Sequence, residues 1–171
     1  SRRYHPPTPP PHFTGRQRES EELLGRLTAP VTPGRSAPVV ALVGMGGIGK
    51  TTLAAAVAAR LSGGTVERVL WAPVATADPM DILQSWAILL ERDISAITAL
   101  DARAATLRTL LAGERALIVL DDLVAGRPVD ALLPGAAACP VLITTRDRAL
   151  AAAYTNTIVE LEELTAGEAL Q

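Results

Sequence analysis

The chain contains few cysteine, histidine and lysine residues, and these absences exclude several classes of function. Its one cysteine, Cys139, permits no internal disulfide, and with only His5 and His12 beside it there is no cysteine–histidine metal cluster. No run of about eighteen apolar residues occurs, so we expect no membrane-spanning segment. The formal net charge of −2 disfavours nucleic-acid binding through overall positive charge. We therefore expect a cytoplasmic protein that directly contacts neither a membrane nor nucleic acid.

Lysine is almost absent, although basic residues are not. Lys50 is the only lysine among the 16 basic residues, and all the others are arginine. The planar fork of arginine and the compact ammonium of lysine are not interchangeable at a crowded phosphate. Either the coding sequence is biased towards arginine and left one stray lysine, or position 50 requires an ammonium. The motif around Lys50, described below, favours the second interpretation.

The distribution of proline indicates one folded domain behind a linker. A chain of 171 residues is typical of a single domain, and an apolar content of 49% argues against disorder. Five of the 13 prolines lie within Pro6–Pro11, in a stretch that is extended and continues neither a helix nor a sheet. We expect residues 1–12 to form a proline-rich linker and residues 13–171 to form the folded domain.

Beyond the linker, apolar runs alternate with helical patterns. The expected strands are residues 39–43, 69–74, 116–120, 141–143 and 158–161, and the expected helices are 16–27, 50–61, one that starts at Asp78 and Pro79, and 100–111. Thr165 and Glu168 form a capping box for a last helix. Pro73 lacks a ladder donor, which predicts an edge strand or a strand that ends there. The alternation predicts an α/β fold with a mostly parallel sheet covered by helices on both faces.

A glycine-rich segment between the first expected strand and the following helix matches the phosphate-loop pattern G-x-x-x-x-G-K-[ST]. Its residues are Gly44, Met45, Gly46, Gly47, Ile48, Gly49, Lys50 and Thr51. Glycine lets the backbone wrap around a phosphate with its N–H groups turned inward. The start of the helix adds further N–H groups and the positive end of its dipole. We expect Lys50 to reach the β- and γ-phosphates and the Thr51 hydroxyl to hold Mg²⁺.

Two carboxylates follow the apolar run 116–120. In an open parallel sheet, ligands bind at the carboxyl ends of the strands, so Asp121 is expected to face the phosphate loop and to hold the magnesium. Asp122 would orient or deprotonate the attacking water. An aspartate is one methylene shorter than a glutamate, and we therefore expect slow hydrolysis. Without the loop, the same pair would be an ordinary turn or helix cap.

Polar residues also follow the run 141–143. Arg146 lies just beyond it and could read the γ-phosphate through a charge-assisted hydrogen bond, which would distinguish ATP from ADP. The alternative from its position alone is an exposed arginine near a helix start, beside Asp147.

Together these motifs resemble the NB-ARC domain of the STAND class of signalling ATPases. GMGGIGKTTL from Gly44 to Leu53, which includes Thr52, resembles the phosphate loop of that family. LIVLDDL from Leu117 to Leu123 is similar to its second motif, and LITTR from Leu142 to Arg146 is similar to its sensor motif. The resemblance implies a three-layer P-loop NTPase sandwich with five strands. It also implies that the sensor strand lies between the strands of the first two motifs, and that Arg146 is the γ-phosphate sensor.

The resemblance extends to the start of the domain and to its use. Phe13, Thr14, Gly15 and Arg16, with Glu19, resemble the element that holds adenine, which implies that Phe13, Thr14 and Arg16 lie near the base. The family further implies a switch that is closed with ADP and self-associates with ATP, in a longer chain with effector and sensor domains. The helical and winged-helix subdomains of the family are absent from this sequence.

Three alternatives to a slow regulatory ATPase use the same loop. A GTPase needs an Asn-Lys-x-Asp guanine reader, and Lys50, the only lysine, does not provide it. A small-molecule kinase needs an acceptor pocket and a lid, and no arginine-rich lid is evident. A third alternative is an assembly module that keeps ATP or ADP as a structural ligand without significant hydrolysis.

Overall fold

The computed structural model describes residues 4–9, 16–46 and 49–162. The strands are β1 Val39–Gly44, β2 Arg68–Pro73, β3 Ala116–Leu123, β4 Val141–Thr145 and β5 Thr157–Leu161. The α-helices are α1 Gln17–Leu27, α2 Lys50–Leu61, α3 Pro79–Leu89, α4 Leu100–Leu111 and α5 Arg148–Ala152, and η1 Asp130–Leu132 is a 3₁₀ helix. The capping box predicted at Thr165 and Glu168 lies outside the described residues.

The strands form one five-stranded sheet in the order β2-β3-β4-β1-β5, and every pair in it is parallel. The prediction of a mostly parallel α/β sheet is therefore confirmed. The position implied for the sensor strand is also confirmed, because β4 lies between β1 and β3. Pro73 is the last residue of the edge strand β2, where a missing ladder donor costs nothing.

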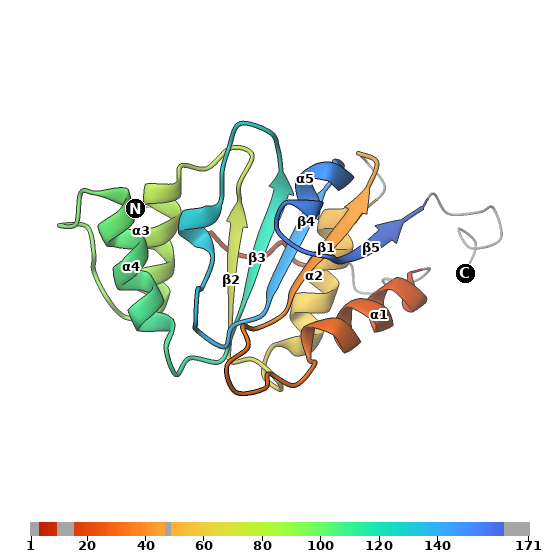
Figure 1. Cartoon of the computed structure of the whole chain (residues 1–171), viewed down its shortest axis with the longest axis horizontal. Coiled ribbons are helices and arrows are strands. Elements are labelled where there is room, and N and C mark those ends of the chain that lie inside the picture. Colours follow the sequence, from red (N-terminus) through yellow and green to blue (C-terminus); the bar gives the residue numbers. More distant parts are fainter. Residues whose placement is uncertain (1–3, 10–15, 47–48, 163–171) are drawn as a thin grey trace.

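Two layers of helices cover the two faces of the sheet (Figure 1). One face packs on α3, α4 and α5 around the fully buried Trp86, and the other packs on α1 and α2 around Leu23 and Leu53. The indole Nε1 of Trp86 donates to the backbone oxygen of Trp71 at 3.1 Å, which fixes α3 to the edge strand. The result is the three-layer sandwich that the sequence predicts.

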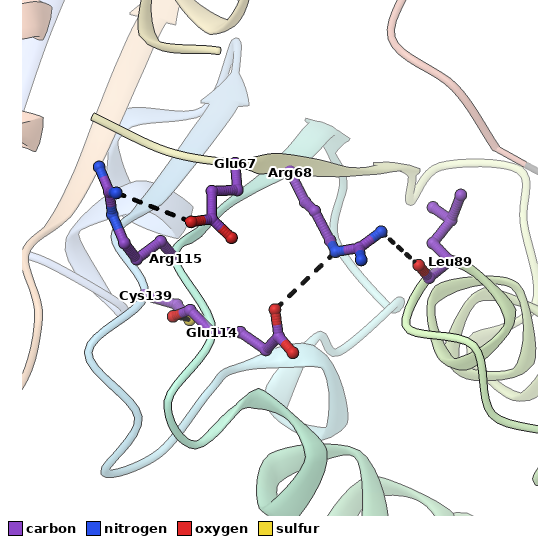
Figure 2. Close-up of polar contacts among 6 residues, drawn as sticks. All are labelled: Glu67, Arg68, Leu89, Glu114, Arg115 and Cys139. Atoms are coloured by element: carbon purple, nitrogen blue, oxygen red, sulfur yellow. Dashed lines mark hydrogen bonds and ion pairs between the residues drawn. The ribbon is translucent and has the colours of Figure 1, made fainter. Parts of the chain in front are cut away.

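The amino ends of β2 and β3 are held together by charged side chains (Figure 2). Nε of Arg68 lies 3.8 Å from Oε2 of Glu114, and Nη1 of Arg115 lies 3.7 Å from Oε1 of Glu67. Arg68 also donates to the backbone oxygen of Leu89 at 2.7 Å. The thiol of Cys139 is buried beside this group, and burial raises its pKa, which keeps it protonated and unreactive. The charged side chains at this amino edge of the sheet therefore pair with one another, whereas those of the phosphate site lie at the opposite, carboxyl edge.

Two short helices, η1 and α5, are not among the expected helices, although a helix start beside Asp147 was considered as the alternative for Arg146. Each is too short, at three and five residues, to show an apolar periodicity. The only local signal for α5 is Asp147, whose side chain accepts from the backbone N of Leu150 at 3.1 Å and caps the helix. Within the described residues, no helix has both the length and the apolar character needed to cross a bilayer.

Candidate phosphate-binding site

A cavity of about 680 Å³ opens at the carboxyl edge of the sheet. The residues that line it come from the loop after β1, the first turn of α2, the end of β3 and the end of β4: Gly46, Gly49, Lys50, Thr51, Thr52, Asp121, Asp122, Val124, Thr144 and Arg146. The parallel sheet explains this convergence, because all five strands end at the same edge. Segments that are about seventy and a hundred residues apart in the chain thus meet at one place.

The glycine-rich loop reaches the cavity at its last turn, which leads into α2. Gly49 has φ 91°, a left-handed conformation that strains any residue with a side chain, and it is the N-cap of α2. The Nζ of Lys50 donates to the backbone oxygen of Met45 at 2.8 Å across the loop. Gly44 ends β1, Met45 is 69% exposed, and Gly47 and Ile48 lie outside the described residues. The ammonium of Lys50 is thus held at the mouth of the loop.

Lys50 is buried, and its charge is balanced by the groups across the cavity. Burial lowers the pKa of the Lys50 ammonium, and the Arg146 charge lowers it further. The carboxylates of Asp122 and Asp121 act in the opposite direction and favour the charged form. Two cations and two carboxylates therefore line one cavity, so it offers positive charge to a phosphate and negative charge to a metal ion.

Asp121 is held by two hydroxyl groups. Thr51 Oγ1 lies 3.0 Å from both carboxylate oxygens of Asp121, and Thr144 Oγ1 donates to Asp121 Oδ1 at 2.6 Å. Burial raises the pKa of the Asp121 carboxyl, whereas the bonds from Thr144 and Thr51 lower it. Side-chain oxygens from α2 and β3 are thus preassembled, and oxygen is the ligand type that Mg²⁺ prefers.

Thr144 is a site residue to which the sequence analysis assigned no role. Its hydroxyl donates to Asp121 Oδ1 and accepts from the backbone N of Asp122 at 2.8 Å, so one side chain holds both aspartates. The register of β3 against β4 shifts between Leu120 and Leu123, and Asp122 has φ 64°. This bulge removes Asp122 from the ladder and turns its side chain to solvent, while Thr144 replaces the lost backbone partner. LITTR contains Thr144, but only the β3–β4 register shows where its hydroxyl points.

Arg146 leans over the phosphate loop. A Cβ atom at Gly46 would lie 2.8 Å from Nη1 of Arg146, closer than two such atoms can approach. Arg146 is exposed and lines both the main cavity and a smaller one of about 350 Å³ beside β5. Because Gly46 has no side chain, there is room beside it for the guanidinium of Arg146.

The residues expected near adenine are only partly described. Phe13 and Thr14 lie outside the described residues. Arg16 immediately precedes α1, is 7% exposed and lies 3.9 Å from Oε1 of Glu19, but it does not line the main cavity. Among the described residues, no group of three or more histidine, cysteine or acidic side chains could hold a metal ion by itself.

The raised pKa of Asp121 predicts a pH-dependent stability. A carboxyl that binds its proton more tightly when folded stabilises the fold less as pH rises from its unfolded pKa of about 4 towards its folded pKa. Asp121→Asn has no carboxyl at this position and so does not lose stability in this way. In the absence of added nucleotide, we therefore expect the Tm of the variant to rise relative to the Tm of the wild type as pH increases. Differential scanning calorimetry between pH 4 and 8 measures both Tm values, and a difference that stays constant with pH would contradict the prediction.

Comparison with known proteins agrees with this geometry. The model of the NB-ARC domain matches residues 16–171. The chain is 36% identical over 167 residues to "Regulatory protein AfsR" of Streptomyces coelicolor and 37% identical over 171 residues to the protein of that name from Streptomyces griseus. These matches cover 92% and 96% of this chain, which spans only 17% of the length of either relative.

Solved structures with the same fold come from archaeal proteins. The ORC2 protein of Aeropyrum pernix, solved as ADPNP and ADP complexes, superposes with a TM-score of 0.65 at 21% identity, over 91% of this chain and 49% of that one. Cdc6p of Pyrobaculum aerophilum gives a TM-score of 0.63 at 20% identity, over 96% of this chain and 49% of that one. These likenesses show the fold alone. The family model, which covers most of the chain, shows more: this chain belongs to the NB-ARC domain family.

Proposed function

We propose that this chain is the ATP- and ADP-binding switch module of a regulatory ATPase. The observation that carries the proposal is the convergence of Lys50, Thr51 and Asp121 on one cavity of about 680 Å³ at the carboxyl edge of the sheet. Membership of the NB-ARC family supports a nucleotide as the ligand. The name of its relatives, which are called regulatory proteins, supports a regulatory use.

The groups around the cavity suit a polyphosphate. The N-terminus of the twelve-residue helix α2 presents free N–H groups and a positive dipole end to the cavity. The Nζ of Lys50 already donates to the oxygen of Met45 at 2.8 Å, and a phosphate oxygen would take over that bond. A buried ammonium gains more from an anionic partner than an exposed one does, because little water competes. Phosphate would therefore be bound by Lys50 and by backbone N–H groups together.

Asp121 and Thr51 would hold Mg²⁺ beside the phosphates. Their carboxylate and hydroxyl oxygens lie 3.0 Å apart, and water and phosphate oxygens would complete the shell that Mg²⁺ usually keeps. When bound, the metal neutralises charge on the phosphates. The adenine contacts that we propose, from Phe13, Thr14 and Arg16, rest on the resemblance of that element to the family.

Asp122 would orient or deprotonate the attacking water. Its side chain is exposed, and its backbone N, in a residue with φ 64°, donates to Thr144 Oγ1 at 2.8 Å. An aspartate is one methylene shorter than a glutamate and reaches less far towards the water, so we expect a turnover below about 10 per second, the median for enzymes. Phosphate release from the full-length protein measures it. A faster turnover would contradict the slow ATPase, and no release above that of Asp122→Asn would favour an assembly module without hydrolysis.

Lys50→Ala should abolish nucleotide binding and leave the fold intact, because Lys50 donates only to the oxygen of Met45 within the described part of the chain. Lys50→Arg should not restore binding, since the wider guanidinium does not fit where the ammonium lies. Isothermal titration with Mg·ATP and Mg·ADP measures the affinities, and circular dichroism checks the fold. Unchanged affinity for ATP in Lys50→Ala would contradict the assignment.

Arg146→Ala should narrow the preference for ATP over ADP. A hydrogen bond between a guanidinium and a phosphate contributes about 1.5–3 kcal/mol, so the preference should fall by about tenfold or more. Gly46→Ala should act in the same direction, since its methyl group would meet Nη1 of Arg146 and displace the side chain. Gly25→Ala, where a Cβ meets nothing within 4 Å, is the control. Equal losses of affinity for both nucleotides in Arg146→Ala would count against a sensor.

Self-association with ATP, and control of it by hydrolysis, belong to the same proposal. The chain corresponds to only 17% of the length of the AfsR proteins, so effector and sensor domains would occupy other parts of such a protein. Arg146 would distinguish ATP from ADP, and the bound nucleotide would in turn determine which contacts the effector and sensor domains make.

A further inference from the structure

The proline-rich segment lies against the domain. The backbone N of Tyr4 donates to Oγ of Ser85 on α3 at 3.1 Å, and the side chain of Tyr4 packs on the cluster formed with α3 and α4. From there residues 4–9, red in Figure 1, pass behind β2 and β3 towards α2. They form neither helix nor strand, as expected of a linker, but Tyr4, Pro6 and Pro9 are half-buried. The segment is therefore anchored at one end and packed along its length.

Residues 6–9 form one wall of a groove of about 370 Å³ beside α2 and β2. The facing wall is made by three alanines of α2, the serine that follows the helix and one residue of β2: Ala55, Ala58, Ala59, Ser62 and Val69. Positions 55, 58, 59 and 62 are spaced by three and four residues, so they share one face of the helix. Small side chains there let a backbone approach α2 closely, and Ala55 and Ala58 are almost fully buried.

The helix layer on this side does not extend over β2. Here α1 packs mainly on β1 and β5, and α2 packs mainly on β1, β3 and β4. Val69 and Trp71 of β2 nevertheless face this layer, and Trp71 is only 3% exposed. A segment that lies beside α2 and reaches Val69 therefore occupies the place that a further helix would take.

Proline suits this position for two reasons. A proline has no backbone N–H, so its burial in an apolar groove leaves no unpaired donor. A proline-rich segment is already extended when free, so docking it costs little conformational entropy. The alternating exposure also fits, because Pro6 and Pro9 are half-buried whereas Pro7 and Thr8 are exposed.

We propose that the surface made by Ala55, Ala58, Ala59 and Ser62, together with Val69, is a docking surface for a proline-rich segment, and that residues 6–9 cover it as a strap within the same chain. The strap covers the outer part of the sheet and braces α2 along the half that follows Lys50 and Thr51. This inference does not depend on nucleotide binding, since none of the groove residues lines the phosphate cavity.

Two sets of variants test the groove from its two sides. Pro6→Asp with Pro9→Asp places charge on the half-buried positions, and Pro7→Asp with Thr8→Asp places the same charge on exposed ones. Ala59→Arg obstructs the groove from an exposed position of α2, and Ala105→Arg on the exposed face of α4 is its control. All four proteins should fold, because no fully buried side chain is changed.

Hydrogen exchange of the protein is the measurement. We expect the amides of residues 58–62 and 69–71 to exchange at least about tenfold faster in the Pro6/Pro9 variant, and the Tyr4 amide to exchange about tenfold faster in Ala59→Arg. Both controls should match wild type. Equal exchange in all five proteins, or faster exchange in the controls as well, would overturn the proposal. Mg·ATP affinity should stay within about twofold in every variant, which separates this test from that of the phosphate site.

Discussion

The phosphate site depends on a buried carboxylate that is held by hydroxyl groups and that forms no ion pair within the described part of the chain. Asp121 is 8% exposed, and its closest partners are Thr51 at 3.0 Å and Thr144 at 2.6 Å. If Asp121 were paired directly with the Lys50 ammonium, each group would be occupied by the other. Instead the ammonium binds the Met45 oxygen, so the cation and the anion each keep capacity for a ligand. Burial of Asp121 under these conditions raises its pKa, so the ionised form of the carboxyl is destabilised.

The division of the sheet into two rims follows from the same constraint. Parallel strands end together, so every polar group needed by the cavity can follow a buried strand without disturbing the core. At the amino rim, Arg68 and Arg115 pair with acidic side chains and with backbone oxygens, which consumes their bonding capacity. At the carboxyl rim, Arg146 and Lys50 line the cavity. The two rims show how the same residue types serve stability at one end and binding at the other.

The sequence predicted what depends on periodicity and on local chemistry. Five buried strands, the helices that carry apolar stripes, and the loop from Gly44 to Thr51 all follow from patterns within about twenty residues. What it did not predict depends on pairing between distant segments: the bulge at Asp121 and Asp122, the two bonds of Thr144, and the groove beneath residues 6–9. Proline content correctly indicated an extended segment, but composition does not show whether that segment packs on an apolar surface of the domain.

Arg146 and Gly46 indicate how a nucleotide could change this domain. The guanidinium lies where a methyl group at Gly46 would meet it, and its charge acts on the ammonium of Lys50. Two cations held together repel each other, and a third phosphate would relieve that repulsion more than a second one would. Since Arg146 lies two residues after Thr144 and leads into α5, any shift that binding imposes on it would pass to β4 and α5. A ligand shifts the equilibrium between two conformations of a protein only if it binds one of them more tightly than the other. In this fold, such a difference in affinity for the nucleotide would arise at the carboxyl end of β4.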